Sequence, residues 1–491
     1  MLQAESRRVR EALIAKLRDI LPRQFVLTET EQLRPYECDG LTAYRQLPWI
    51  VVLPSNREEV EKILALCTAC GVPVVARGAG TGLSGGALPH PHGVLLSMTR
   101  LDRILSVDRA NRTARVQPGV RNIAISEEVE GMGLYYAPDP SSQIACSIGG
   151  NVAENSGGVH CLKYGLTVHN ILKLEVVLMS GESVTIGADA LDMPGYDLLA
   201  LMTGSEGMLG VVTEVTVRLL PKPAVARVIL AAFDDLAMAG NAVAAIIGAG
   251  IIPAGLEMMD NPAIRAVEDF VHAGYPRDAA ALLLCELDGT ESEVEAGIRV
   301  VTRILELQGA TEIRVATDEA ERQRFWSGRK NAFPAVGRIS PDYYCIDGTI
   351  PKKRLGEVLT GISKLSNEYD LRVANVFHAG DGNLHPLILY DGGQPGEFER
   401  TEALGGKILE LCIAVGGTIT GEHGVGVEKL NQMCVQFEAP ELDQFHAIKK
   451  AFDPAALLNP GKAVPTLARC AEFNAMHVHK GRLPFPELPR F

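Results

Sequence analysis

Strand-like apolar runs alternate with helix-like patterns along most of the chain. The first run covers residues 49–54, a helix pattern follows at 58–70, and a second run covers 72–77. Helical spacing of apolar residues between short buried runs predicts an α+β or α/β unit. Further strands are predicted at 93–98, 113–117, 172–179 and 210–219, and a leading amphipathic helix at 1–21.

A proline-rich stop, Leu220-Pro221-Lys222-Pro223, divides this pattern. Beyond it, strands at 228–233, 281–287 and 311–315 alternate with longer helices, which indicates a second α/β layer domain. A third segment starts near Gly421 and ends in a tail rich in proline and histidine. The predicted parts are a helical segment at 1–47, a first domain at 48–222, a second at 223–420 and a C-terminal segment at 421–491.

Length and charge exclude several classes of protein. A chain of 491 residues is too long for one hydrophobic core, so two or three domains are expected. The formal net charge of −13 argues against a nucleic-acid partner, which needs a surplus of lysine and arginine. Residues 1–21 mix acids with arginines, unlike a signal or transit peptide, and the longest apolar stretch, 225–252, is interrupted by charges. These features predict a cytoplasmic protein without a membrane span.

The ten cysteines are scattered along the chain. The only close pair, Cys67 and Cys70, lies in a helix pattern, and no second CxxC completes a zinc or iron–sulfur set. We therefore expect ordinary reduced thiols, as in a cytosolic protein.

The 49 glycines are clustered, and the first cluster directly follows a predicted strand at residues 77–87. Closely spaced glycines expose successive backbone N–H groups, which can wrap an anion such as phosphate. Gly80, Gly82 and Gly85 satisfy GxGxxG, but prolines and another strand follow instead of the helix that a Rossmann loop requires. A merely flexible loop is the alternative interpretation.

Two more glycine-rich loops follow at residues 148–158 and 204–212. Three such loops within roughly 130 residues suit a long ligand that lies across one domain, with small residues where the backbone approaches a planar ring.

The three loops, in this order, resemble the vanillyl-alcohol-oxidase type of FAD-binding domain over residues 48–221. That resemblance implies that the first loop cradles the pyrophosphate, that residues 138–141 and 149–158 line the flavin and ribityl chain, and that the third loop lies near the adenosine half or the isoalloxazine edge. Members that attach FAD covalently carry a histidine in or beside the first loop, which here holds none before His90, so the FAD is expected to be noncovalent. The implied FAD-binding residues are Arg77, Gly78, Gly80, Thr81, Gly82, Leu83, Gly86, Ala87, Pro138, Asp139, Ser141, Gly149, Gly150, Asn151, Ala153, Asn155, Gly157, Gly158, Glu206, Gly210, Val212 and Asn459.

A candidate metal site begins with two histidines around an Asp-Gly pair. Strand-like runs flank Asp381-Gly382, which is the strongest short signal for a β-hairpin. With these two residues as the turn, His378 would lie directly opposite His385, with Cβ atoms about 5 Å apart. Two imidazoles placed in this way can chelate one divalent ion.

The segment 420–426 supplies a third ligand, Glu422, next to another histidine, His423. Two histidines and one carboxylate with an open position form a catalytic zinc pattern, which iron or manganese would also accept. Hydrogen-bonded turn histidines are the alternative. Only 11 histidines exist in the chain, and three of them fall in these two short motifs.

Both motifs resemble the FAD-linked oxidase C-terminal domain, whose members oxidise D-lactate, D-2-hydroxyglutarate or glycolate. The segments 325–333 and 342–351 are most similar to the glycolate-oxidase type. The resemblance implies an α+β protein with a vanillyl-alcohol-oxidase type FAD-binding domain and an α/β cap domain built on an antiparallel sheet. The C-terminal segment would complete the active site and pack on the FAD-binding domain. The implied roles are metal ligation by His378, His385 and Glu422, binding of the substrate carboxylate by Arg329, and proton abstraction by His423.

Only the resemblance singles out Arg329, and a surface salt bridge is the alternative for it. Similar 2-hydroxyglutarate enzymes place polar or basic groups near three positions that here hold Phe333, Cys345 and Leu387. An apolar lining leaves a second carboxylate unpaired at a high cost, so a monocarboxylic acid such as glycolate or lactate is expected.

Electrons must leave to an external acceptor, because the sequence has neither a cysteine cluster for iron–sulfur nor a nicotinamide fingerprint. The resemblance implies partner subunits, one related to this chain and one carrying iron–sulfur clusters, often near the inner membrane. The alternatives are a stand-alone D-lactate or D-2-hydroxyglutarate dehydrogenase, a metal-dependent hydrolase, and a non-catalytic FAD-binding companion subunit.

Overall fold

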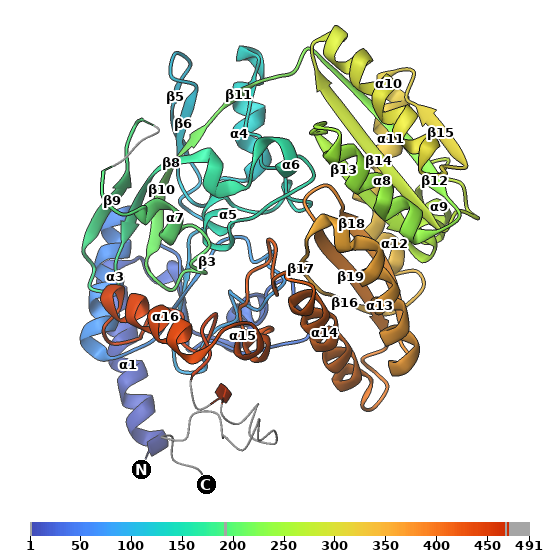
Figure 1. Cartoon of the computed structure of the whole chain (residues 1–491). Coiled ribbons are helices and arrows are strands. Elements are labelled where there is room, and N and C mark those ends of the chain that lie inside the picture. The colour runs from blue at the N-terminus through green and yellow to red at the C-terminus, as the bar shows by residue number, and fades with distance from the viewer. Residues whose placement is uncertain (1, 191–193, 467–468, 471–491) are drawn as a thin grey trace. The chain divides into compact units, whose positions relative to one another are not determined.

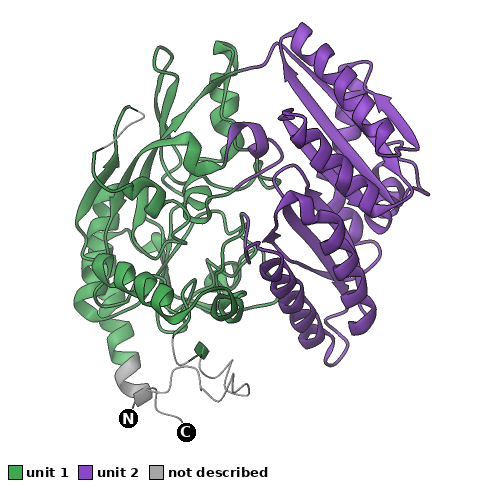
Figure 2. Ribbon diagram, in the orientation of Figure 1, with its two compact units in different colours: residues 1–156, 166–221, 422–491 green, residues 157–165, 222–421 purple. Residues whose placement is uncertain are grey.

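The computed structural model describes residues 2–190, 194–466 and 469–470. It divides into two compact units, which Figure 2 colours separately. Both units combine segments that are distant in the sequence. Unit 1 consists of Met1–Ser156, Leu166–Pro221 and Glu422–Phe491, and unit 2 of Gly157–Gly165 and Lys222–Gly421.

The first sheet of unit 1 has the order β1-β2-β4-β3. β2 and β3 both pair with β4 in parallel, as expected when helix α3 connects consecutive strands. The predicted leading helix, the predicted helix at 58–70 and the three predicted strands are confirmed. Their bounds are α1 Leu2–Ile20, β1 Val26–Leu27, β2 Ile50–Val52, α3 Arg57–Cys70, β3 Val74–Arg77 and β4 Val94–Ser97.

The second sheet of unit 1 is antiparallel, with the order β5-β6-β10-β8-β9. The strands predicted at 113–117, 172–179 and 210–219 are confirmed as β6, β8 and β10, whereas β5 and β9 were not predicted. Both missed strands carry several half-exposed or exposed residues, so their apolar pattern is weak. The bounds are β5 Ile104–Asp108, β6 Thr113–Val116, β8 Ile171–Val177, β9 Ser183–Gly187 and β10 Val211–Arg218, with β7 Leu134–Tyr135 and β11 Leu220–Pro221 as a separate pair.

The core of unit 1, in its described part, includes two large hydrophobic clusters. One joins α1 and α3 to the first sheet, with Leu17, Ile63 and Leu96 fully buried. The other joins helices α4 and α5 to the second sheet, with Val152 and Val215 fully buried. The remaining helices described in unit 1 are α2 Thr30–Leu33, α4 Asn122–Val129, α5 Ile148–Glu154, α7 Leu198–Met202, α15 Leu430–Gln436 and α16 Ala439–Phe452.

The second glycine cluster is not a simple loop as predicted. Residues 148–154 form helix α5, whose apolar side chains Ile148 and Val152 are buried in the core. The helix ends at Asn155, which adopts the left-handed conformation with φ of 54°. The glycines near its start hid the helical spacing of the apolar residues.

Unit 2 is built on one antiparallel sheet with the order β15-β12-β14-β13-β18-β19-β16, and β17 pairs with β19. The strands predicted at 228–233, 281–287 and 311–315 are confirmed as β12, β14 and β15. The central strands are buried along nearly their whole length, which indicates helices packed against both faces. The bounds are β12 Val225–Phe233, β13 Gly255–Asp260, β14 Ala281–Gly289, β15 Glu312–Val315, β16 Asp342–Cys345, β17 Gly348–Thr349, β18 Arg372–His378 and β19 Asn383–Tyr390.

Helices cover this sheet (Figure 1). α8 and α10 pack on β12 and β14, while α13 and α14 pack on β18 and β19. α9 packs on β13 and contacts α11 and α12. The bounds are α6 Cys161–Tyr164, α8 Leu236–Gly248, α9 Asn261–Val271, α10 Glu291–Leu307, α11 Glu319–Lys330, α12 Ala332–Val336, α13 Leu355–Tyr369 and α14 Glu397–Ala414.

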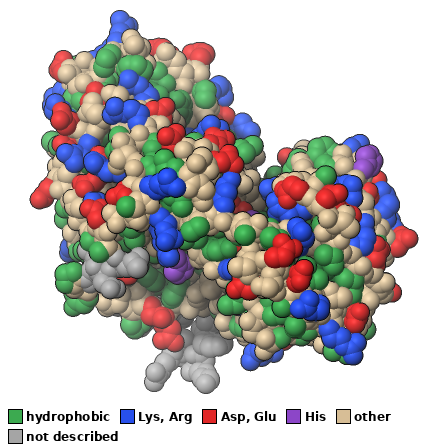
Figure 3. All heavy atoms as spheres, turned by 90° about the horizontal axis from the view of Figure 1, so that it is seen from above, with side chains coloured by type: hydrophobic (Ala, Val, Ile, Leu, Met, Phe, Trp, Pro, Cys, Tyr) green, Lys and Arg blue, Asp and Glu red, His purple; other side chains and the backbone are tan. Residues whose placement is uncertain are grey.

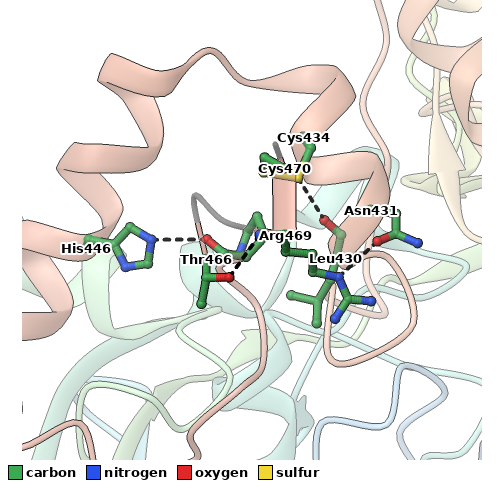
Figure 4. The surroundings of a disulfide bond; sticks show 8 residues. Leu430, Asn431, Cys434, His446, Thr466, Arg469 and Cys470 are labelled. Atoms are coloured by element: carbon green, nitrogen blue, oxygen red, sulfur yellow. Dashed lines mark hydrogen bonds between the residues drawn. A yellow bond between two sulfur atoms is a disulfide. The ribbon is translucent and has the colours of Figure 1, made fainter. Parts of the chain in front are cut away.

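The expectation that all cysteines are reduced is wrong for one pair. Cys434 of α15 forms a disulfide with Cys470, 36 residues further along the chain (Figure 4). The two Cα atoms lie 5.3 Å apart, a normal separation for a disulfide. Nearby, Arg469 donates to the side chain of Asn431, which also holds this segment against α15. Because the two cysteines are 36 residues apart, no short cysteine motif in the sequence indicates that they pair.

Charged side chains of both signs lie on the surface of the protein (Figure 3). On the face shown in Figure 3, acidic and basic side chains are interspersed, so this face is not a basic surface of the kind that nucleic acid requires. None of the helices in the described part of the chain has the length and hydropathy needed to cross a membrane.

Candidate active site

One face of the unit 2 sheet collects the predicted histidine ligands. His385 of β19 lies opposite Val376 of β18, which in turn lies opposite Met259 of β13. Side chains two residues apart in a strand share a face. His378, two residues after Val376, and Glu257, two residues before Met259, therefore project from the same face as His385. The two histidine rings lie 5.1 Å apart between centroids, at 87° to each other.

The predicted register of the histidine hairpin is wrong. A two-residue turn at 381–382 would place His378 opposite His385, but His378 pairs with Asn383. The turn is longer because the N–H of Gly382 donates to the carbonyl of His378 at 3.1 Å, which leaves residues 379–382 outside the ladder. The histidines are diagonal neighbours, a spacing that long side chains still bridge.

Three predicted ligands come together in the structure. One ligand atom from each of His378, His385 and Glu422 lies within 4.8 Å of the other two. Glu422 directly follows Gly421, the last residue of unit 2. Two imidazole nitrogens and a carboxylate oxygen are a donor set that suits zinc, iron or manganese.

Glu257 is a buried acid that sequence analysis did not single out. Its Oε1 lies 2.9 Å from Nδ1 of His378, and its Oε2 accepts a hydrogen bond from Nε of Arg329 at 2.7 Å. Burial by itself would raise the pKa of Glu257, but the charges of His378 and Arg329 and the hydrogen bonds from them lower it below its usual value. A signal existed in the sequence, because Glu257 lies between the apolar residues Leu256 and Met258 of β13 and a buried acid must find a partner.

Arg329 is buried, and the alternative of a surface salt bridge does not hold. It lies in the last turn of α11 and is 1% exposed. Its Nη2 is buried and has no hydrogen-bond partner among the described protein atoms. An orphaned guanidinium donor beside the histidine face is suited to an anionic ligand.

The three apolar positions expected near the substrate belong to the same face. Leu387 is two residues from His385 in β19 and lies opposite Cys345 of β16. The ring of Phe333 contacts the ring of Tyr343 at 6.0 Å between centroids, and Tyr343 is two residues before Cys345. Each of these side chains therefore lies on or beside the face that carries His385.

A second group of candidate ligands includes one of these positions. Single ligand atoms of Cys345, His385 and His423 also lie within 4.8 Å of one another. Since His385 belongs to both groups, it is the residue that any ion at this face would most need. The thiol of Cys345 donates to the carbonyl of Ile346.

Asp347, a fully buried acid, anchors the turn that leads to Glu422. Its Oδ2 accepts hydrogen bonds from Oγ1 of Thr420 at 2.6 Å and from the N–H of Gly421 at 2.9 Å. The backbone immediately before Glu422 is therefore tied to the unit 2 sheet.

Replacing Asp347 by alanine is expected to lower the free energy of unfolding by about 1–3 kcal/mol, because two donors lose a charged acceptor in a buried site. Bound metal should also fall, since Glu422 loses its anchor. Thermal denaturation and metal analysis measure the two effects. Asp342→Ala is the control, because Asp342 accepts from Gly392 in an exposed position. Equal stability of the two variants would contradict the anchoring role.

The three glycine clusters meet around α5 in unit 1. The N–H of Ala79 in the first cluster donates to Oγ of Ser147, the N-cap of α5. In the third cluster, the N–H of Gly204 donates to the carbonyl of Val152 at 2.8 Å. A Cβ at Gly78 would lie 2.1 Å from Oγ of Ser147, so only glycine allows this approach. The structure thus brings together the segments expected to bind one extended cofactor.

Arg77 and Asn459 connect neighbouring parts of this region. Arg77 is buried, and its Nη1 donates to the carbonyl of Cys38 at 2.6 Å. The side chain of Asn459 donates to the carbonyls of Gly86 and Glu206, which links the first and third clusters. Both side chains hold loop backbone in place.

Glu206 clamps the backbone just after His423. Its carboxylate oxygens accept the N–H groups of Val425 at 2.7 Å and Gly426 at 2.6 Å. The neighbouring acid Glu154 was not predicted. Burial raises the pKa of Glu154 well above its usual value, and the charges of Glu206 and Asp39 raise it further.

The remaining predicted FAD-binding residues lie in the three glycine clusters, in the segment 138–141 before α5, and at the start of β10. Pro138 accepts a hydrogen bond from the side chain of Asn122, and the N–H of Ala87 donates to Asp39. Gly157 and Gly158 belong to the segment that joins unit 2. Gly210 precedes β10, and Val212 lies within it, opposite Val176.

Two family models match the sequence. The model described as FAD binding domain covers residues 48–187, and the model described as FAD linked oxidases, C-terminal domain covers residues 222–463. The chain belongs to the FAD-linked oxidases.

Relatives of this FAD-linked oxidase align along nearly its whole length. It is 67% identical to glycolate oxidase subunit GlcD of Escherichia coli (strain K12), covering 98% of this chain and 97% of that protein. It is 32% identical to D-lactate dehydrogenase of Anaerostipes hadrus, covering 94% and 99%. The chain is therefore an FAD-linked oxidoreductase.

Solved structures confirm the fold of this FAD-linked oxidase. Substrate-bound p-cresol methylhydroxylase has a TM-score of 0.78 at 18% identity, covering 93% of this chain and 97% of that one. The expected α+β architecture, with a vanillyl-alcohol-oxidase type FAD-binding domain, is confirmed.

Proposed function

We propose that this FAD-linked oxidase converts a small 2-hydroxy monocarboxylic acid, glycolate or D-lactate, to the 2-oxo acid. The observation that carries the proposal is the buried guanidinium of Arg329, whose Nη2 has no hydrogen-bond partner among the described residues, close to a sheet face that presents two histidines. An anionic substrate satisfies the orphaned donor, and the histidine face supplies the groups that act on its hydroxyl.

Arg329 binds the substrate carboxylate. The pair of Nη atoms offers a bidentate hydrogen bond to a carboxylate, which fixes orientation as well as affinity. The bond from Nε to Glu257 holds the guanidinium in place. Because Arg329 is buried, this binding also excludes water from the carboxylate end of the substrate.

His378, His385 and Glu422 would hold a divalent metal, for which zinc is the expected ion and iron or manganese are alternatives. The donor chemistry fits, since the three ligand atoms lie within 4.8 Å of one another. His378 also has the carboxylate partner on its other ring nitrogen that metal-binding histidines usually have.

His423 acts as the base that takes the proton of the substrate hydroxyl. A bound metal would supply Lewis acidity that makes this hydroxyl easier to deprotonate, and bound FAD would supply the acceptor for two electrons and the hydrogen of C2. The clusters around α5 would bind this FAD without a covalent link. Glu206 supports the base by holding the backbone at Val425 and Gly426.

The side chains around His385 favour a monocarboxylic acid. Phe333, Cys345 and Leu387 offer no cation for a second carboxylate, and an unpaired charge beside them would be costly. The E. coli relative at 67% identity is named glycolate oxidase subunit, which supports glycolate as the first substrate to test.

Partner subunits would receive the electrons. The E. coli relative is named as a subunit of glycolate oxidase, which supports an assembly with a related flavin-domain subunit and an iron–sulfur subunit. We place this assembly in the cytoplasm, peripheral to the inner membrane. A stand-alone D-lactate dehydrogenase is the second candidate, supported by the Anaerostipes hadrus relative.

Anaerobic mixing with D- and L-2-hydroxy acids tests the proposal. Glycolate or D-lactate is expected to bleach the yellow flavin, and D-2-hydroxyglutarate is expected to do so at least about a hundredfold less efficiently, because its second carboxylate would be unpaired. Absence of bleaching by every 2-hydroxy acid would refute the proposal. Rapid reduction of an artificial dye by the isolated chain would favour the stand-alone dehydrogenase.

A further inference from the structure

The carboxylate of Glu257 connects two side chains with different proposed tasks. Its Oε1 lies 2.9 Å from Nδ1 of His378, a proposed metal ligand, and its Oε2 accepts from Nε of Arg329, the proposed carboxylate binder. Glu257, Arg329 and His378 are 1%, 1% and 4% exposed. All three belong to unit 2, on β13, α11 and β18.

We propose that Glu257 is a positioning residue that sets both the metal-binding orientation of His378 and the substrate-binding orientation of Arg329. This inference rests on the proposed function of the site. Each oxygen of the Glu257 carboxylate binds one partner. The position of the metal is thereby coupled to the position of the substrate carboxylate.

The bond to His378 selects which ring nitrogen is offered to a metal. With Nδ1 donating to Glu257, the neutral ring carries its proton on Nδ1 and presents the lone pair of Nε2. The same bond fixes the ring plane. Loss of such a carboxylate partner typically weakens metal binding about 10–100-fold.

The bond to Arg329 selects which edge of the guanidinium meets the substrate. Nε donates to Glu257, so the Nη atoms are left to bind the substrate carboxylate, and Nη2 has no hydrogen-bond partner in the described part of the chain. A guanidinium held at Nε cannot rotate about its own axis without breaking this bond. Its planar fork is therefore oriented before substrate binds.

The surroundings explain why one acid serves both partners. On the same face of the sheet, Met259 lies two residues along β13 and Leu284 of β14 lies opposite Glu257, and both are buried. In an apolar setting of this kind, an ionised group needs every oxygen paired, and two cationic or donor side chains meet that requirement.

A purely structural role is the competing explanation, and the molecule contains a matched comparison. Glu286 of β14 is also buried, and its carboxylate binds His160 at 3.0 Å and Arg322 at 2.7 Å. It also accepts from the indole of Trp326. None of these partners is a proposed metal ligand or substrate binder.

Purified FAD-loaded wild type, Glu257→Gln and Glu286→Gln are compared. Glutamine keeps the shape but can accept at only one of the two positions. Titration with Zn²⁺ against a chelator should show about 10–100-fold weaker binding for Glu257→Gln and wild-type affinity for Glu286→Gln. This readout does not depend on turnover.

The KM for glycolate is the second quantity to measure. With Zn²⁺ in excess, the metal content of Glu257→Gln should return to that of the wild type, while KM for glycolate should stay raised about tenfold, the effect of one lost orienting hydrogen bond. Glu286→Gln should keep the wild-type KM.

Glu257→Asp keeps the charge but has a shorter side chain, so its loss of Zn²⁺ affinity and its rise in KM should both be smaller. This variant replaces Glu257→Gln in the test if Glu257→Gln does not fold. Equal Zn²⁺ affinity and KM in wild type and the Glu257 variants, or equal losses in the Glu286 variant, would overturn the inference. If wild type binds Zn²⁺ but oxidises no 2-hydroxy acid, the proposed function fails, while the Zn²⁺ titration still tests Glu257.

Discussion

Replacing His423 by asparagine is expected to slow reduction of the flavin by glycolate about a thousandfold, the range that a lost general base typically costs. Asparagine keeps hydrogen-bonding capacity but cannot take the hydroxyl proton. Bound FAD should remain, because the glycine clusters around α5 do not depend on this side chain. Anaerobic stopped-flow absorbance measures the rate.

The control for this experiment is His446→Asn. His446 lies in α16, and its Nε2 contacts the carbonyl of Pro465 (Figure 4). This variant should reduce its flavin at the wild-type rate. If His423→Asn also did so, the proton would have to leave to another group, and the role of His423 would be wrong.

Replacing His385 by alanine is expected to remove the metal and to lower turnover with glycolate at least about a hundredfold, because His385 belongs to both groups of candidate ligands. Metal analysis of the purified protein and steady-state assay with a dye acceptor measure these effects. Treating the wild type with a chelator should lower turnover by a similar factor.

The control for the metal experiment is His272→Asn. His272 is exposed after α9 in the left-handed conformation, which asparagine tolerates. Its metal content and turnover should equal those of the wild type. Full metal content in His385→Ala would show that the histidine face does not hold the ion.

Much of the fold could be predicted because apolar runs of the correct length mark buried strands. The strands of the unit 2 sheet at 228–233 and 281–287 were identified in this way. Helix α5 was missed because its glycines at 149–150 resemble a loop, while burial of Ile148 and Val152 supports the helix. Tertiary packing decides between helix and loop in such a segment.

The candidate metal ligands could be named from the sequence because short motifs carry them, but their geometry could not. The Asp-Gly pair predicts a two-residue turn from local preference alone. In the structure, the hydrogen bond from the N–H of Gly382 to the carbonyl of His378 lengthens the turn, and β18 also pairs with β13, a strand far away in the sequence, which a local turn preference cannot report.

The role of Glu257 could not be predicted from a sequence motif. It stands alone among apolar residues, 72 positions from Arg329 and 121 from His378. Only the sheet register and the docking of α11 bring the three side chains together. The Cys434–Cys470 disulfide was missed for the same reason, since its partners meet only in the folded chain.

The segment 157–165 has a consequence for dissecting the protein. His160 contacts Glu286, and Lys163 and Tyr164 both donate to Asp288, so this short piece is part of the polar framework of unit 2. A recombinant fragment that starts at residue 222 would lack these three side chains. Glu286 and Asp288 would then lose hydrogen-bond partners that they have in the full chain. Such a truncation is expected to be less stable than a fusion that reattaches 157–165 through a glycine linker, and thermal denaturation of the two proteins would measure the difference.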